Sequence, residues 1–106
     1  MAKFLIAASY TADGVKGLLQ AGGTARVAAV RKTVEGLGGT VESFYFAFGS
    51  DDALVTVDLP DNVSAAALGL AVSASGMTTA RTTVLLTPEE IDAATKKQVA
   101  YTPPGQ

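Results

Sequence analysis

The sequence predicts a small α+β protein of the ferredoxin-like type, in which a single domain follows the order βαββαβ. Three observations predict this fold. With 106 residues, the chain has enough apolar material for one core but not for two. Hydrophobic residues make up 48% of it against 17% charged, which is typical of a folded chain rather than a disordered one. Apolar residues recur with period two in strand-length segments and at helical spacing between them.

The first half of the pattern predicts a strand and an interrupted helix. Lys3 to Tyr10 is short and apolar, as in a buried strand, and Thr11 then follows as a helix N-cap. Gly22-Gly23 interrupts the helical pattern, which restarts and ends at Gly38-Gly39, where glycine forms a C-cap without strain. The restarted helix has an apolar stripe of Val27, Val30, Val34 and Leu37, with Arg26, Arg31, Lys32 and Glu35 around it.

A hairpin is predicted next, formed by residues 40–48 and 53–59 around the turn Gly49 to Asp52. Period two in its first strand places Phe44, Phe46 and Phe48 on one face and Val41, Ser43, Tyr45 and Ala47 on the other. Pro60-Asp61-Asn62 begins the second helix, which is rich in alanine and so suited to a close approach to the sheet.

The fourth strand is predicted over residues 78–86, which are rich in β-branched side chains. Thr87-Pro88-Glu89-Glu90 then combines a cap, a proline at the first helical position and acids in the first turn, so a short helix is expected to about Val99. Residues 1–100 are therefore interpreted as one domain, and residues 101–106 as an extended tail.

Several classes of function are excluded by composition. The chain has no histidine and no cysteine, which removes imidazole-dependent triads, thiolate chemistry and the commonest metal ligands. Carboxylates are too sparse to favour an all-oxygen site, so we expect neither a metal nor a cofactor. Scattered basic residues and a net charge of −2 argue against nucleic acid as a partner. The apolar run after Lys3 is too short for a secretory leader or a membrane span, so a cytoplasmic protein is expected.

The open face of the predicted sheet is the place where a partner is expected. Both helices of a ferredoxin-like fold cover the same face, so the other face meets water, a ligand or a second copy. The mixture expected there is too apolar for a solvated surface and too polar for a core, which favours a face-to-face homodimer. The residues expected on this face are Val41, Ser43, Tyr45 and Ala47, together with Lys3, Leu5, Ala7, Ser9, Leu54, Thr56, Asp58, Thr79, Arg81 and Thr83.

The chain resembles the GYD-domain family over nearly its whole length. The residues that carry the resemblance are the opening Phe-Leu-Ile-Ala-Ala-Ser-Tyr-Thr, Gly14 to Leu19, Gly39 to Asp52, Asp58 to Asn62, Leu86 to Glu90 and the Tyr-Thr-Pro-Pro-Gly tail. In the family's naming motif, tyrosine and aspartate follow a glycine at the hairpin turn; here Asp51 stands in place of the tyrosine, between Gly49 and Asp52. The resemblance implies a small bacterial protein without an assigned activity and a fold similar to the dimeric α/β-barrel proteins.

Five polar residues are candidates for a ligand site or an interface: Tyr10, Tyr45, Asp52, Asp58 and Arg81. The tyrosines could orient a ligand or pack with one hydrogen bond, and the Asp51-Asp52 pair could act as acids or form the turn. Arg81 on a sheet face needs an anionic partner. One candidate is Asp58, which would form a structural ion pair with Arg81 across a dimer. The alternative is that Arg81 binds an anionic ligand.

Two functions follow from these features. The first is a non-catalytic homo-oligomeric binding or assembly module, whose open sheet face and Pro-Pro-Gly tail make subunit contacts. The second is a cofactor-independent enzyme of the dimeric α/β-barrel type, with Tyr10, Tyr45, Asp52 and Arg81 around a small apolar or aromatic substrate. An enclosed cavity where at least two of these four side chains converge would favour the enzyme, and a filled interior would favour assembly.

Overall fold

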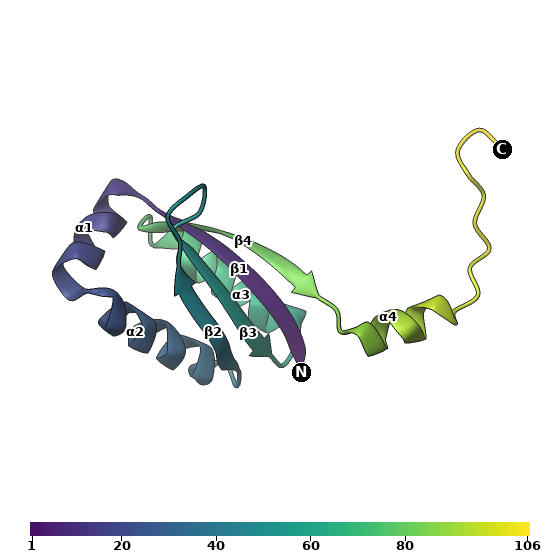
Figure 1. Ribbon diagram of the computed structural model, residues 1–106, viewed down its shortest axis with the longest axis horizontal. Coiled ribbons are helices and arrows are strands. Elements are labelled where there is room, and N and C mark those ends of the chain that lie inside the picture. Colours follow the sequence, from purple (N-terminus) through teal and green to yellow (C-terminus); the bar gives the residue numbers. More distant parts are fainter.

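The computed structural model describes residues 1–106 as four strands and four helices (Figure 1). Their bounds are β1 Ala2–Tyr10, α1 Ala12–Ala21, α2 Gly23–Gly36, β2 Thr40–Phe46, β3 Ala53–Leu59, α3 Asn62–Ala74, β4 Thr78–Leu85 and α4 Pro88–Thr95. All strands pair antiparallel in one sheet of order β2-β3-β1-β4. This confirms the predicted α+β, ferredoxin-like βαββαβ fold.

Both long helices pack on the same face of the sheet. The core joins Val34 of α2 and Leu68 of α3 to side chains from β1, β2 and β3 in one apolar cluster, of which Phe4, Val34, Val57 and Leu59 are the largest fully buried members. α2 lies mainly against β2 and α3 mainly against β4, so the two helices cover opposite halves of the sheet. The opposite face of the sheet carries no helix.

The helix ends confirm the caps predicted at Thr11 and Thr87, and Asp61 provides a third. The Thr11 and Asp61 side chains accept hydrogen bonds from backbone N–H groups in the first turns of α1 and α3, and Thr87 forms a reciprocal capping box with Glu90. Gly22 separates α1 from α2 with φ at 84°, a backbone conformation that favours glycine. The break is therefore conformational, as the sequence indicated.

The face assignment of β2 is wrong at both of its ends. A bulge between Val41 and Ser43 inserts an extra residue, so Val41 lies opposite Val57 and is buried in the core instead of lying on the open face. The strand ends at Phe46, and Phe48 is fully exposed in the turn rather than facing the helices. Phe44, beyond the bulge, does face the helices.

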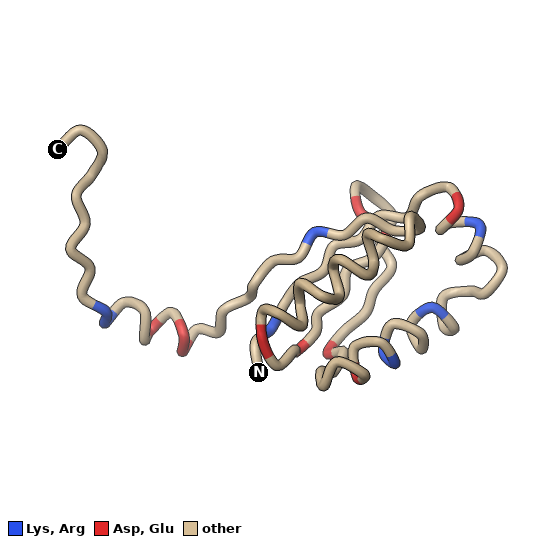
Figure 2. Tube along the Cα trace, turned by 180° about the vertical axis from the view of Figure 1, so that it is seen from behind, with Lys and Arg blue, Asp and Glu red and all other residues tan.

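The chain leaves the body of the fold after β4. α4 ends at Thr95, earlier than the expected Val99, and the arm from Leu86 to Gln106 projects away from the sheet and is exposed throughout (Figure 1). Two of the three acids of α4, Glu89 and Glu90, lie in its first turn and Lys96-Lys97 directly follow the helix, which complements the helix dipole (Figure 2). None of the four helices has the length and apolarity needed to cross a membrane.

Candidate functional site

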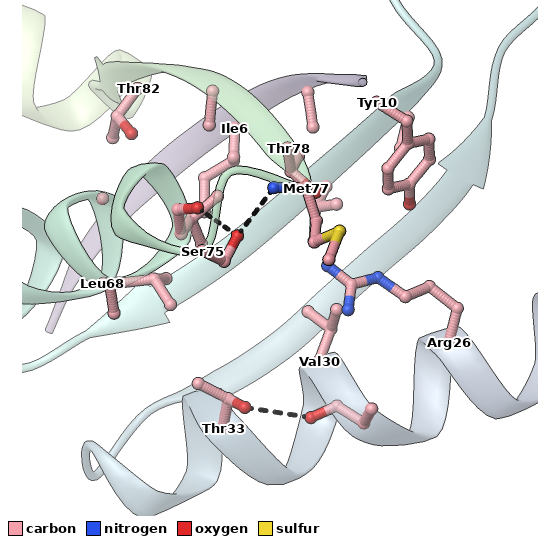
Figure 3. A pocket seen from close by; sticks show the side chains of 18 of the residues that line it. Ile6, Tyr10, Arg26, Val30, Thr33, Leu68, Ser75, Met77, Thr78 and Thr82 are labelled. Atoms are coloured by element: carbon pink, nitrogen blue, oxygen red, sulfur yellow. Dashed lines mark hydrogen bonds between the residues drawn. The ribbon is translucent and has the colours of Figure 1, made fainter. Parts of the chain in front are cut away.

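A cavity of about 330 Å³ lies between the sheet and helices α2 and α3 (Figure 3). Its floor consists of the helix-facing side chains of all four strands, including Ile6, Phe44 and Val55. Val30 lies on one wall and Leu68 on the other. Of the 19 lining residues 13 are hydrophobic, so the space suits a small, largely apolar molecule.

The cavity exists because the side chains around it are small. Ala29 on α2 and Gly69 and Ala71 on α3 face Ala8 and Ala80 on the sheet. A Cβ added to Gly69 would meet nothing within 4 Å. Since α2 and α3 cover different strands, neither helix fills the space between them. The alanine-rich second helix was expected to approach the sheet closely, but here its small residues leave room beside it.

Two of the hydroxyl groups in the lining are used by the helices themselves. The Thr33 Oγ1 donates to the carbonyl oxygen of Ala29 at 3.1 Å, and the Ser75 Oγ donates to that of Val72 at 2.6 Å (Figure 3). The Ser75 Oγ also accepts from the backbone N–H of Met77 at 3.1 Å. Each hydroxyl thus donates its hydrogen to a backbone carbonyl three or four residues earlier in the chain and not to a ligand.

Arg26 is the only charged residue in the cavity lining. Its guanidinium lies 5.8 Å from the centroid of the Tyr10 ring, and the Tyr10 hydroxyl points toward it (Figure 3). The Arg26 Nε is buried and has no hydrogen-bond partner. Arg26 is not among the five candidate residues predicted from the sequence, although Arg26, Val30 and Val34 are spaced four apart and therefore lie on one face of α2. That spacing is the signal that could have found it.

Of the four residues proposed for an enzyme, only Tyr10 lines the cavity. Tyr45 lies opposite Leu54 on the open face, with 70% of its surface exposed. The Asp52 Oδ2 accepts a hydrogen bond from the Tyr10 backbone N–H at 2.8 Å, and the Asp52 N–H donates to the Ala8 carbonyl at 2.8 Å. Asp52 therefore anchors the hairpin turn to β1, in agreement with the turn-forming interpretation.

Within a single chain, Arg81 and Asp58 have different partners. Arg81 lies opposite Ala7 of β1, near the hairpin turn, and its guanidinium donates to both carboxylate oxygens of Asp51 at 2.9 Å. Asp58 lies at the other end of β3, directly opposite Lys3, whose ammonium group is 3.0 Å from it. Asp51 therefore forms an ion pair with Arg81 across β1 on the open face.

Lys3 holds the other end of the open face together. Its ammonium group pairs with Glu42 as well as with Asp58, and these hydrogen bonds, first that of Glu42 and then that of Asp58, raise the pKa of Lys3 above its usual value. The amine therefore stays protonated across the physiological range. No three acidic side chains lie together in a way that could hold a metal ion.

The comparisons with known proteins agree with the resemblance seen in the sequence. No curated protein and no solved structure matches the chain. The family model of the GYD domain matches residues 4–95, which include all four helices, three whole strands and β1 from Phe4 onward. The chain therefore belongs to the GYD domain family.

Proposed function

We propose that this protein is a non-catalytic, homo-oligomeric binding module that holds a small, largely apolar molecule between its sheet and helices α2 and α3. The observation that carries the proposal is the cavity of about 330 Å³ with its mostly hydrophobic lining. Ligand pockets span roughly 300–1,000 Å³, so this cavity matches a compact ligand of one or two rings. A protein that served assembly alone would gain stability by filling this space.

The arrangement of polar groups favours binding over catalysis. The enzyme hypothesis required at least two of Tyr10, Tyr45, Asp52 and Arg81 to converge on one substrate, but only Tyr10 lines the cavity. Asp52 is engaged by the Tyr10 backbone and Arg81 by Asp51. The geometry therefore offers a place to bind a molecule without a cluster of acid and base groups around it.

A second copy of the chain is the proposed partner of the open sheet face. Leu5, Ala7, Tyr45 and Leu54 place apolar side chains on this face, with the ion pairs of Lys3 toward one end of the strands and Arg81 on the edge strand β4. Apolar side chains bordered by charged groups are the usual composition of a protein interface. We therefore expect a dimer, and light scattering that reports a monomer at micromolar concentration would contradict this part of the proposal.

The C-terminal arm supports the same partner. α4 has eight residues, and helices shorter than about 12–15 residues are marginal in water without tertiary packing. Ile91, Val99 and Tyr101 expose apolar surface along the arm. A neighbouring subunit would supply the packing that the arm lacks within its own chain. A bacterial cytoplasm is the proposed setting, because the first apolar segment forms the central strand β1 and is needed for the sheet.

The cavity is tested with a thermal-shift screen of neutral aromatic compounds with one or two rings. We compare the wild type with Gly69→Leu, which places a side chain in the cavity, and with Gly17→Leu, a matched substitution on α1 where a Cβ likewise meets nothing within 4 Å. A compound that binds the folded state raises its melting temperature. We expect hits for the wild type and Gly17→Leu that Gly69→Leu loses. A screen without hits, or hits retained by Gly69→Leu, would refute the cavity as the binding site.

A further inference from the structure

The charge on the cavity wall has no counterpart in the chain. Arg26 projects from the first turn of α2 toward Met77 and Tyr10 on the opposite side of the cavity (Figure 3). The ion pairs of the protein involve Lys3 and Arg81, both on the other face of the sheet, and Arg26 forms none. Its Nε is buried without an acceptor.

The Arg26 side chain is half-buried, and a guanidinium whose Nε is buried without an acceptor is incompletely satisfied. Arginine stays protonated at every pH a protein meets, so it cannot relieve the cost of burial by losing its charge. The Tyr10 ring, 5.8 Å from the guanidinium carbon, provides cation–π attraction but accepts no conventional hydrogen bond at Nε. An acceptor from outside the chain would satisfy the N–H and balance the charge in the same step.

The other residues of the cavity lining indicate what kind of ligand would bring that acceptor. The Thr33 and Ser75 hydroxyls donate to their own helices, and most of the surface beyond them is hydrocarbon, including Ile6, Val55 and Leu68. The cavity therefore has one charged end, where Arg26 lies beside the Tyr10 hydroxyl, and a mainly apolar remainder in which the Thr78 and Thr82 side chains add two hydroxyl groups. A ligand complementary to it has a single anionic group attached to a compact apolar body.

We infer that the cavity binds a small carboxylic acid in its ionised form, with an aliphatic or aromatic body, and that Arg26 recognises the carboxylate. The planar guanidinium matches the two carboxylate oxygens, and the Tyr10 hydroxyl can donate a further hydrogen bond. This inference rests on the proposed function, because it names the class of ligand for the same cavity.

The experiment uses matched pairs of probes that differ only in charge, such as 3-phenylpropanoate and 3-phenylpropanamide. Isothermal titration at neutral pH measures both affinities for the wild type, Arg26→Met, Arg26→Lys and the control Lys32→Met, which removes a positive charge from an exposed position on the same helix. We expect the wild type and Lys32→Met to bind the acid at least tenfold more tightly than the amide. Arg26→Met should lose this preference while still binding the amide, and Arg26→Lys should keep part of it, because lysine retains the charge without the planar fork.

The outcomes separate this inference from the proposed function. Equal affinity of the wild type for acid and amide would overturn carboxylate recognition and leave cavity binding intact. A preference that survives in Arg26→Met would overturn the role of Arg26. Binding of neither probe class by the folded wild type would refute the proposed function and this inference together. The comparison of the two probes on the wild type needs no variant, so it decides the question even where Arg26→Met fails to fold.

Discussion

Replacing Gly14 by alanine should separate the first turn of α1 from the end of the sheet. A Cβ at this position would overlap the carbonyl oxygen of Met77, and it would lie 3.0 Å from the Met77 carbonyl carbon and 3.3 Å from the Tyr10 Cβ. The carbonyl is not free to move, because it accepts hydrogen bonds from the Thr11 backbone N–H at 2.9 Å and from the Thr11 hydroxyl at 3.2 Å. The backbone of α1 or of the residues before β4 must therefore shift.

The size of the effect follows from two opposing terms. Overpacking of this kind costs about 1–3 kcal/mol, whereas alanine gains up to about 1 kcal/mol over glycine in a helix. Gly17→Ala is the matched control, because it lies in the same helix and its Cβ would meet nothing within 4 Å. Both variants receive the helical gain and only Gly14→Ala meets the obstruction. Their free energies of unfolding should therefore differ by about 1–3 kcal/mol, with Gly14→Ala the less stable.

Urea denaturation followed by circular dichroism, at one fixed protein concentration, measures this difference. Because Met77 and Tyr10 also line the cavity, Gly14→Ala should weaken ligand binding as well. Equal stability of Gly14→Ala and Gly17→Ala would show that the close approach of α1 to Met77 does not exist in solution.

Two further predictions concern a helix cap and the arm. The backbone N–H of Ser64 lowers the pKa of Asp61, so the stabilisation by this N-cap should be complete above the usual value of 3.8 and lost as the pH falls through the lower pKa of the folded state. Asp61→Asn keeps an acceptor but does not titrate, so the stability advantage of the wild type over it should vanish in acid; an advantage that persists at pH 2 in urea titrations would contradict this. Removing residues 87–106 should leave the melting curve of a dilute, monomeric sample unchanged but raise the dimer dissociation constant in sedimentation experiments, whereas unchanged association would exclude the arm from the interface.

The element order could be predicted from sequence because its signals are local. Thr11, Asp61 and Thr87 each combine a side-chain acceptor with the turn that uses it, and Gly22 supplies the positive φ that breaks the first helix. Such signals act within about four residues and do not depend on tertiary contacts. The order of strands and helices was therefore correct, and with it the fold.

The faces of β2 could not be predicted because the pattern was interrupted by tertiary structure. Strict alternation places Val41 with Ser43 and Tyr45, whereas the bulge moves Val41 to the core opposite Val57. A bulge is an exception to period two and leaves no mark in the run of residues 40–48 itself. The partner of Arg81 could not be predicted either, because it too depends on how the strands pair. Asp51 and Asp58 are equally plausible by charge, and only the register of β4 on β1 brings Arg81 to the turn.

The cavity and its arginine were missed for related reasons. Small residues on a helix are compatible both with close packing on a sheet and with an empty space beside it, and the choice depends on how far α2 and α3 lie apart. Arg26 was assigned to the polar surroundings of a stripe that starts at Val27, yet it occupies the stripe itself, one turn before Val30. A charged residue within the apolar stripe of a helix conflicts with the packing that the stripe predicts. Without an acidic partner for Arg26 in the chain, that conflict is best resolved by an anion from outside, and the cavity provides the space for the rest of the molecule.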